Sequence, residues 1–549
     1  MSTTLTISCL DVAFAARTLF RGLDLVLADG NVTAVVGANG SGKSTLMRTI
    51  VGELPVESGT IQLAPRDATI GWLPQVVPDP AESLLAYARR RTGVATADRD
   101  LDHASVALAE GRPGAEDEYA AALDRWLALG AADLEDRLPQ VAGTVGLDVG
   151  PDRPLGSLSG GQAARAALVA VLLSRYDVLL LDEPTNDLDA RGLALMVEFV
   201  TGHQGPILIA SHDRSFLDRV TTHVVELDLA QQRIGHYAGG WSEYVAAREL
   251  VRRHARAAYE TFAGQRDDLV AQASRRDDWA AKGHRNVASG GETDKHIREK
   301  HKARADRQSA KASRLRRAVD RLDVVEQPRK EWELRYSISP GSEPAAVVAT
   351  LDRAEVVRDG FRLGPVDLTV ARGDRIAVAG DNGSGKTTLV KALLGEIPLS
   401  AGRRSLGTRV RTGVLDQRRS LLESDASVVD VVRAELAGPG QGPDRGEVRT
   451  LLAKFGLGSE HVDRPARTLS MGERTRALMA VFQAREVNVL VLDEPTNHLD
   501  VTAIEQLESA LAGYTGTLLV VSHDEALVES LGVTHHWQVD AGRVSVSRV

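Results

Sequence analysis

Short apolar runs in the chain end at glycine or at acidic residues. They are VTAVVG (32–37), RIAVAG (375–380), VLLLDE (178–183) and VLVLDE (489–494). Uninterrupted apolar runs of this length are typical of parallel strands buried on both faces. In WELRYSI (332–338) apolar and polar residues alternate, which predicts another strand. We therefore expect an α/β fold with parallel sheets.

The middle of the chain shows a helical pattern instead. Apolar residues spaced by seven, four, three, four, seven and four positions form one narrow seam; they are Tyr244, Val251, Ala255, Ala258, Phe262, Leu269 and Ala273. A similar seam consists of Ala312, Leu315, Val319 and Leu322. We predict an antiparallel helical hairpin whose first helix, at about 40 residues, is about 60 Å long. Gly290 and Gly291 would allow the turn, and Thr293 would cap the returning helix.

The chain contains two copies of one domain. VVGANGSGKSTL (35–46) returns as VAGDNGSGKTTL (378–389), and VLLLDEPTNDLD (178–189) returns as VLVLDEPTNHLD (489–500). The phosphate-loop lysines lie 343 residues apart, whereas the later motifs lie 311 apart, so the first copy holds an insertion. We place this insertion, read as helices, at 88–129. The expected domains are 1–243, a helical linker at 244–325, and 326–549.

Charge is distributed unevenly along the 549 residues. The net charge is −9, but residues 245–325 hold 20 Lys and Arg against 12 Asp and Glu, which leaves −17 for the rest. A basic segment in an acidic protein is typical of a phosphate-rich partner, although a solvated surface is the alternative. A single cysteine, Cys9, excludes a disulfide framework and favours a reducing compartment. Without a leader or a long apolar run, we expect a cytoplasmic protein outside the membrane.

Each copy carries the pattern GxxxxGK[ST] directly after an apolar strand, at Gly37–Ser44 and at Gly380–Thr387. Glycines let backbone N–H groups face a phosphate, and the lysine reaches the outer phosphates. The Ser or Thr hydroxyl can bind Mg²⁺. Asp182 and Asp493, at strand ends, would serve the metal, while the adjacent Glu183 and Glu494 would orient the attacking water.

Two further segments carry a family resemblance. LSGGQ (158–162) and LSMGE (469–473), each before LDEPTN, resemble the signature of ATP-binding cassette proteins. The resemblance covers nearly the whole chain and implies that two cassettes close head to tail over two ATP molecules with Mg²⁺. The phosphate loop of each cassette would then face the signature of the other.

The resemblance assigns residues to both sites. The first ATP would meet Phe14, Gly37, Asn39, Gly40, Gly42, Lys43, Ser44, Thr45, Gln75, Asp182, Glu183 and His212, with Ser470, Gly472 and Glu473 from the other cassette. The second would meet Gly380, Asn382, Gly383, Gly385, Lys386, Thr387, Thr388, Gln417, Asp493, Glu494 and His523, with Ser159, Gly160, Gly161 and Gln162. The magnesium ligands would be Ser44, Gln75 and Asp182, and Thr387, Gln417 and Asp493. Glu183, Glu494, His212 and His523 would be catalytic.

The two copies also differ. Phe14, which would stack on adenine, lies 29 residues before Lys43, and the same spacing before Lys386 falls on Val357. The second signature has Met471 where glycine is usual. We therefore expect unequal nucleotide affinity at two otherwise complete sites.

Two fused cassettes with a charged helical linker resemble the ABC-F subfamily, as do HYAGGWSEYVAARE (236–249) and QPRKEWELRYSI (327–338) at the linker ends. That resemblance implies a monomer that binds the ribosome at the E site. The linker would reach large-subunit rRNA and P-site tRNA near the peptidyl-transferase region, and the insertion would lie near uL1. The expected RNA contacts are His284, Arg285, Asn286, Lys295 and His296.

Our leading hypothesis is an ABC-F ATPase that protects the ribosome from antibiotics. A general translation factor of the same subfamily is the alternative within the class. A transport ATPase serving a separate membrane subunit and a scaffold that only binds ATP are alternatives of other classes. The two intact glutamates argue against the scaffold.

Overall fold

The computed structural model describes residues 2–14, 17–73, 79–186, 188–228, 233–288, 295–322, 343–358, 360–437 and 442–548. They form two compact units, one of Met1–Ser242 with Leu334–Val549 and one of Glu243–Glu333. The first unit contains both sequence repeats, and the second contains the basic linker.

The first repeat is built on two sheets. A six-stranded sheet has the order β5-β6-β7-β3-β8-β9, with all neighbours parallel except β8 and β9. A three-stranded antiparallel sheet has the order β2-β1-β4. The strands are β1 Thr4–Phe14, β2 Arg17–Ala28, β3 Val32–Val36, β4 Ser58–Ala64, β5 Ile70–Leu73, β6 Val178–Asp182, β7 Ile207–Ala210, β8 His223–Asp228 and β9 Arg233–Ala238. Every residue of β3, β6 and β7 is buried, which confirms the prediction from the apolar runs.

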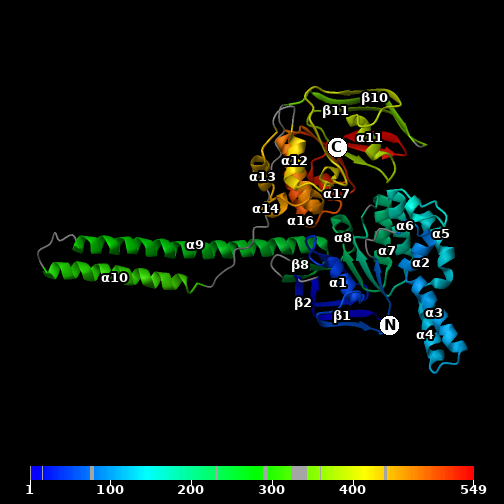
Figure 1. Cartoon of the computed structure of the whole chain (residues 1–549), viewed down its shortest axis with the longest axis horizontal. Helices are drawn as coiled ribbons and strands as arrows, with labels where there is room; N and C mark the ends of the chain where they lie inside the picture. Colours follow the sequence, from blue (N-terminus) through cyan, green and yellow to red (C-terminus); the bar gives the residue numbers. More distant parts are fainter. Residues whose placement is uncertain are drawn as a thin grey trace. The chain divides into compact units, whose positions relative to one another are not determined.

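Eight α-helices of the first repeat are described. They are α1 Lys43–Ile50, α2 Leu84–Arg91, α3 Val94–Ala109, α4 Ala115–Ala128, α5 Leu134–Thr144, α6 Gly160–Leu173, α7 Ala190–Gly202 and α8 Arg214–Val220. The paired helices α3 and α4 fall inside the span in which we placed the insertion (Figure 1). Helix α1 packs Leu46 and Met47 against Leu5, Leu23 and Leu27 in one apolar core.

The second repeat has the same architecture. Its six-stranded sheet has the order β14-β15-β16-β12-β17-β18, and its three-stranded sheet the order β11-β10-β13. The strands are β10 Val347–Arg358, β11 Phe361–Ala371, β12 Arg375–Ala379, β13 Ala401–Leu406, β14 Thr412–Leu415, β15 Val489–Asp493, β16 Thr517–Val521, β17 His535–Asp540 and β18 Arg543–Arg548. The α-helices are α11 Lys386–Leu394, α12 Val428–Leu436, α13 Arg445–Lys454, α14 Ser459–Val462, α15 Met471–Ala484, α16 Val501–Ala512 and α17 Glu525–Ser530. Two tandem α/β cassettes are thus confirmed.

The strand order explains how distant motifs meet. In the first repeat β6, β7 and β3 are neighbours, and in the second β15, β16 and β12 are neighbours. The carboxyl ends of parallel strands share one edge of a sheet, where ligands bind in open α/β folds. The phosphate loop, the paired acids and the histidine, His212 or His523, therefore converge at that edge in each cassette.

The second unit is a helical hairpin of α9 Trp241–Ala288 and α10 Lys295–Val319, which lie side by side (Figure 1). With 48 residues, α9 is about 72 Å long, longer than predicted. Ala273, Ala280 and Ala312 are buried between the helices. The predicted strand at 332–338 and the turn residues Gly290, Gly291 and Thr293 lie outside the described residues.

The predicted seam of α9 is wrong at Val251, Ala255 and Ala258, whereas Tyr244 at its start is buried. Val251 is 59% exposed, and Ala255 and Ala258 are exposed as well. The reason is length, because α10 has 25 residues and can cover only about half of α9.

Among the described residues, no helix combines the length and the apolar character that a membrane span requires.

Candidate functional site

The phosphate loops of the two cassettes have the same backbone geometry. Helices α1 and α11 begin at Lys43 and Lys386, after Gly42 and Gly385 in the left-handed conformation. A Cβ atom at Gly37 would lie 2.6 Å from the carbonyl oxygen of Leu227, so only glycine fits there. The backbone thus turns tightly and presents N–H groups and a helix N-terminus, as a phosphate requires.

The lysines of both loops are held in place. Lys43 Nζ donates to Gly37 O over 2.9 Å and lies 3.2 Å from His212 Nε2. Lys386 Nζ donates to Gly380 O over 2.5 Å and lies 3.4 Å from His523 Nε2. Burial lowers the pKa of both ammonium groups, and the neighbouring carboxylates oppose that shift. Both cations are thus held at the base of their loops.

Two of the three predicted magnesium ligands of each site also meet. Asp182, at the end of β6, is 7% exposed and is hydrogen-bonded to Ser44. In the second cassette Thr387 Oγ1 donates to Asp493 Oδ2 over 3.3 Å. Burial raises the pKa of both aspartates, while these hydrogen bonds oppose the shift. A hydroxyl beside a carboxylate at a phosphate loop fits Mg²⁺, which prefers oxygen ligands and retains phosphate and water oxygens.

Each glutamate predicted to be catalytic faces its histidine. Glu183 Oε1 lies 3.2 Å from His212 Nε2, and Glu494 Oε1 lies 3.3 Å from His523 Nε2. Both glutamates adopt left-handed backbone angles, with φ of 51° and 46°. Such strain in a non-glycine residue is typical of functional sites.

Burial sets the protonation of these groups. It raises the pKa of Glu183 to about 8, lowers the pKa of His523 to about 4, and lowers the pKa of His212 well below its ordinary value. Both imidazoles are therefore neutral near pH 7. Among the described residues, buried Glu183 Oε2 and His212 Nδ1 have no hydrogen-bond partner. These free positions fit a water or a ligand oxygen.

Sequence reasoning missed Ser41 and Ser384. Their hydroxyls are buried in the two phosphate loops and have no hydrogen-bond partner among the described residues. A buried polar atom without a partner is destabilising unless a ligand satisfies it, so both hydroxyls fit phosphate oxygens. The signal was present in the sequence, because NGSGK is identical in both copies.

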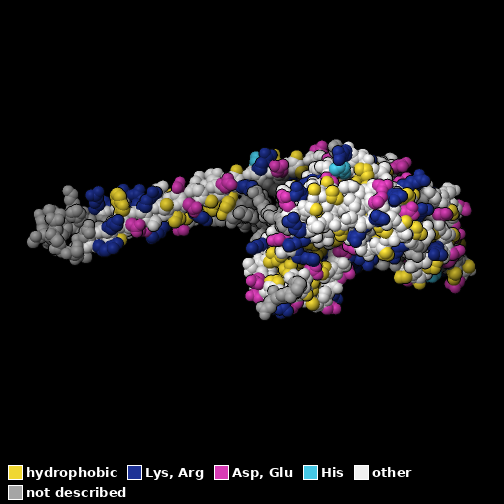
Figure 2. Space-filling model, turned by 90° about the horizontal axis from the view of Figure 1, so that it is seen from above, with side chains coloured by type: hydrophobic (Ala, Val, Ile, Leu, Met, Phe, Trp, Pro, Cys, Tyr) yellow, Lys and Arg dark blue, Asp and Glu magenta, His cyan; other side chains and the backbone are white. Residues whose placement is uncertain are grey.

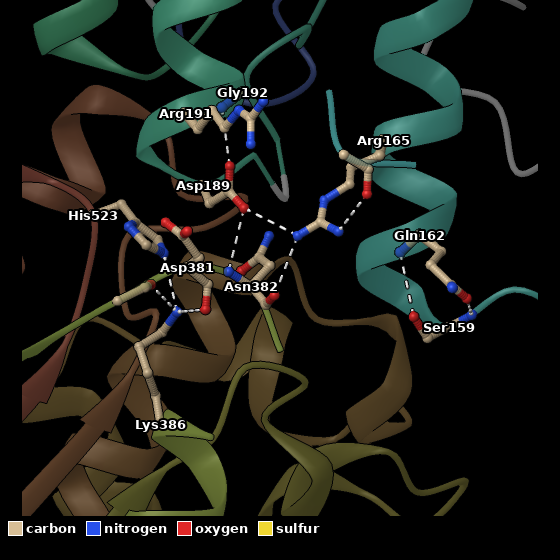
Figure 3. A network of polar contacts seen from close by, with 12 residues as sticks. Ser159, Gln162, Arg165, Asp189, Arg191, Gly192, Asp381, Asn382, Lys386 and His523 are labelled. Carbon is tan, nitrogen blue, oxygen red and sulfur yellow. Dashed lines mark hydrogen bonds and ion pairs between the residues drawn. The ribbon is translucent and has the colours of Figure 1, made fainter. Parts of the chain in front are cut away.

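Contacts between the cassettes join one phosphate loop to the other cassette (Figure 3). Asp189 Oδ2, after the paired acids of the first cassette, accepts from Asn382 N over 3.3 Å, and Arg165 on α6 donates to Asn382 O over 3.3 Å. Arg165 also pairs with Asp189 at 3.5 Å. Arg165 and Asp189, which follow the first signature, are thus hydrogen-bonded to the second phosphate loop.

Equivalent contacts occur at the first phosphate loop. Asn39 N donates to Asp500 Oδ2 over 3.0 Å, and Asn39 Nδ2 donates to His498 O over 3.2 Å. Beside them Arg214 donates to Glu508 over 3.2 Å, and the two side chains are 16% and 17% exposed. The paired contacts of Asn39 and Asn382 have the head-to-tail symmetry that the resemblance implies.

A cavity of about 1060 Å³ lies at this junction. It is lined by Ser159, Gly161, Gln162, His212, Asn382, Gly383, Gly385, Lys386, Thr387, Thr388, Gln417, Asp493, Glu494 and His523. The first signature and the second phosphate loop therefore face one space. The contacts described for Ser470, Gly472 and Glu473 lie within their own cassette, where Ser470 Oγ accepts from Glu473 N over 3.3 Å.

The structure corrects the residue expected beside the second adenine. In the first cassette Phe14 pairs with Arg17 across the β1–β2 turn, and in the second Arg358 pairs with Phe361 across the β10–β11 turn. Arg358, not Val357, thus occupies the position of Phe14. The aromatic ring comes from Phe361 on the opposite strand, and both Arg358 and Phe361 line the cavity. The position 29 residues before the phosphate-loop lysine is not equivalent in the two cassettes, because β10 is one residue longer than β1.

Several predicted contacts lie outside the described residues. They are Gln75 and the side chains of Phe14, His284, Asn286, Lys295 and His296. Arg285 is described and exposed on α9, where its Nε donates to Ala281 O over 3.4 Å.

Tandem phosphate loops, paired acids and signature helices define the class of protein. The ABC transporter family matches residues 20–186 and 363–497, and the chain belongs to this family of ATP-binding cassette proteins. Within it, the chain belongs to the ABC-F subfamily.

Curated relatives span nearly the whole chain. It is 31% identical to the tylosin resistance ATP-binding protein TlrC of Streptomyces fradiae, over 97% of this chain and 96% of that protein. It is 28% identical to the ribosome protection protein VmlR of Bacillus subtilis, over 93% of this chain and 82% of that protein.

The fold also resembles a solved complex of an archaeal ribosomal stalk protein with the archaeal ribosome recycling factor aABCE1. The TM-score is 0.57 at 17% identity, over 98% of this chain and 89% of that chain. At this identity the likeness concerns the fold alone.

Proposed function

We propose that the chain is a cytosolic ABC-F ATPase that binds the ribosome with ATP between its cassettes and leaves after hydrolysis. The observation that carries the proposal is the cavity in which Ser159 and Gly161 of one cassette face Lys386 and Thr387 of the other. A site shared in this way can form only when the cassettes are closed, so nucleotide turnover can control binding.

Both sites hold the groups that phosphoryl transfer requires. Thr387, Asp493 and Gln417 would bind Mg²⁺ at the second site, and Ser44, Asp182 and Gln75 at the first. Bound Mg²⁺ neutralises charge on the outer phosphates. Lys386 and Lys43 would hold those phosphates from the opposite side.

The glutamates and histidines would act on the attacking water. Glu494 and Glu183 accept its hydrogen bond and orient it toward the outer phosphorus atom. The neutral imidazoles of His523 and His212 hold the transferred phosphate by a hydrogen bond. Signature residues Ser159 and Gly161 add a hydroxyl and a helix N-terminus.

The hairpin supplies a surface suited to RNA. Between residues 280 and 317 the sequence holds twelve Lys and Arg against four Asp and Glu, so nearly all the basic excess lies on α10 and the end of α9. Figure 2 shows Lys and Arg side chains close together on the described part of the hairpin. We propose large-subunit rRNA and P-site tRNA as the partners of this surface, and uL1 as the neighbour of the α3–α4 arm. The name of VmlR supports a ribosomal partner.

The name of one relative supports a role in antibiotic resistance, and a general role in translation is the alternative. TlrC, named for tylosin resistance, matches the chain over 97% of its length. Deletion of the gene should lower tolerance to macrolides or other drugs that bind the large subunit. Unchanged tolerance to macrolides, lincosamides, pleuromutilins and phenicols would leave the general translation factor.

Neutralising the hairpin tests the ribosome interaction. Changing Lys302, Arg304 and Arg307 to Gln removes three exposed cations from α10. Co-sedimentation with ribosomes in ATP should fall, and the salt dependence of binding should weaken by up to about one log unit per lost phosphate contact.

A matched control removes the same charge elsewhere. Changing Arg253, Arg256 and Arg266 to Gln alters residues 241–268 of α9, where five basic residues balance five acidic ones. Retained binding by this control, with equal helicity of both variants by circular dichroism, supports the proposal. Equal binding by both variants and the wild type would contradict it.

A further inference from the structure

Arg419 is a fully buried cation two residues after Gln417 in the second cassette. Its side chain is 0% exposed, and its backbone has a left-handed φ of 51°. Burying a guanidinium is costly unless its donors find partners, so its contacts show what holds it there.

The guanidinium joins three segments of the second cassette. Nη1 donates to Gln417 O over 2.7 Å, and Nη2 donates to Pro495 O over 2.7 Å, directly after Glu494. Nε donates to Thr475 Oγ1 on the signature helix α15 over 3.4 Å. Because a guanidinium is a rigid fork, these three segments are fixed relative to one another.

The contact with Thr475 continues into the signature. Thr475 Oγ1 donates to Met471 O over 2.9 Å, between Ser470 and Gly472. A movement of Gln417 therefore reaches the signature backbone through Arg419 and Thr475.

The partners of Arg419 are carbonyl oxygens and a hydroxyl, and no ion pair of it is found among the described residues. Burial lowers the pKa of Arg419 to about 10, so the group stays charged at physiological pH. Asp416 and Asp493 favour that charge. A cation held this way ties loops together more than it stabilises the fold.

The first cassette lacks this connection in its sequence. The spacing of 342 between the two glutamines places Val77 at the position of Arg419, and the spacing of 311 places Ala164 at the position of Thr475. Neither side chain can form the hydrogen bonds. The connection is therefore specific to the second cassette.

We propose that Arg419 is a positioning residue that couples nucleotide binding at the second site to the signature that serves the first. The inference rests on the proposed function, in which the signature around Met471 faces the first ATP. Turnover at the first site should therefore depend on this connection more than turnover at the second, because the first cassette has Val77 and Ala164 at the corresponding positions.

Single-site variants can measure this coupling in the full chain. Glu494→Gln leaves the first site to hydrolyse ATP, and Glu183→Gln leaves the second. Thr475→Val removes the connection to the signature with little change in shape. It should lower kcat about fivefold in the Glu494→Gln protein, the effect of one lost hydrogen bond, and less than twofold in the Glu183→Gln protein.

Two controls separate coupling from a loss of folding. Thr450→Val makes the same change on α13, where the hydroxyl donates to Gly446 O over 2.9 Å, and should leave both values unchanged. Arg419→Lys, which keeps the charge without the fork, should lower kcat of the first site as Thr475→Val does. It also removes the contacts to Gln417 O and Pro495 O, so the comparison of the two sites rests on Thr475→Val.

Equal loss at both sites, or no loss, would overturn the coupling while leaving the proposed function intact. Turnover by neither single-site variant would overturn it too, because sites that work only together are coupled in both directions. Absence of ATP turnover in the wild type would instead contradict the proposed function itself.

Discussion

Replacing Glu183 with Gln should stabilise the nucleotide-free protein, and more so as pH rises. The Glu183 side chain is 12% exposed, and burial raises its pKa from 4.5 to about 8. The folded state therefore holds this proton more strongly than the unfolded chain does. Stability from Glu183 is fully present below pH 4.5 and is lost as pH rises through about 8.

The size of this destabilisation follows from the difference between the two pKa values of Glu183, 4.5 and about 8. At about 1.4 kcal/mol per pH unit, ionisation of Glu183 destabilises the folded state by about 5 kcal/mol above pH 8 and by about 1.4 kcal/mol at pH 5.5. Glutamine has the shape of the protonated carboxyl and does not ionise. The variant should therefore gain about 3 to 4 kcal/mol over the wild type between pH 5.5 and pH 8.5.

Calorimetry without nucleotide or Mg²⁺ tests this expectation. The two cassettes can unfold in separate transitions, so Tm values of each transition should be compared at pH 5.5, 7.0 and 8.5. Glu183→Gln should raise one Tm by several degrees at pH 8.5 and by little at pH 5.5. Exposed Glu57→Gln is the matched control and should shift neither. A shift independent of pH, or a lower Tm at pH 8.5, would refute the reasoning.

Three further predictions concern the sites. In the Glu183→Gln protein, Phe361→Ala should raise the KM for ATP about tenfold, because one aromatic stacking contact is worth about 1 to 3 kcal/mol. An unchanged KM would exclude Phe361 as the residue that contacts the adenine base. Arg214→Ala should leave Glu508 buried without its cation and reduce ATP-driven closure, measured as a smaller change in the scattering radius when ATP is added. His523→Ala should lower kcat of the second site at least tenfold, while the wild-type kcat should show no titration of His523 between pH 6 and 8, since its pKa is about 4.

The sequence predicted those site residues whose chemical role allows few other residue types. Phosphate loops need Gly37 and Lys43, and a metal needs Asp182 at a strand end, so these residues recur in both copies and could be found by repetition. The same repetition could have pointed to Ser41 and Ser384, since both lie in the repeated sequence NGSGK.

The missed residues depend on tertiary structure. The spacing placed Val357, which has no ring, at the second site. Phe361 was missed because irregularities in β10 shift the register by one residue, which spacing alone does not reveal. Arg419 resembles an ordinary surface arginine until its partners on α15 and after Glu494 are brought together. The α9 seam had the right helical period, but burial depended on the length of α10.

The central claim is that closed, ATP-bound cassettes hold this protein on the ribosome. The most direct test is co-sedimentation of the Glu183→Gln, Glu494→Gln double variant with ribosomes in ATP and in ADP. The account predicts stable association in ATP, little in ADP, and weaker association of the hydrolysing wild type in ATP. A double variant that binds ATP but does not sediment with ribosomes would contradict the account.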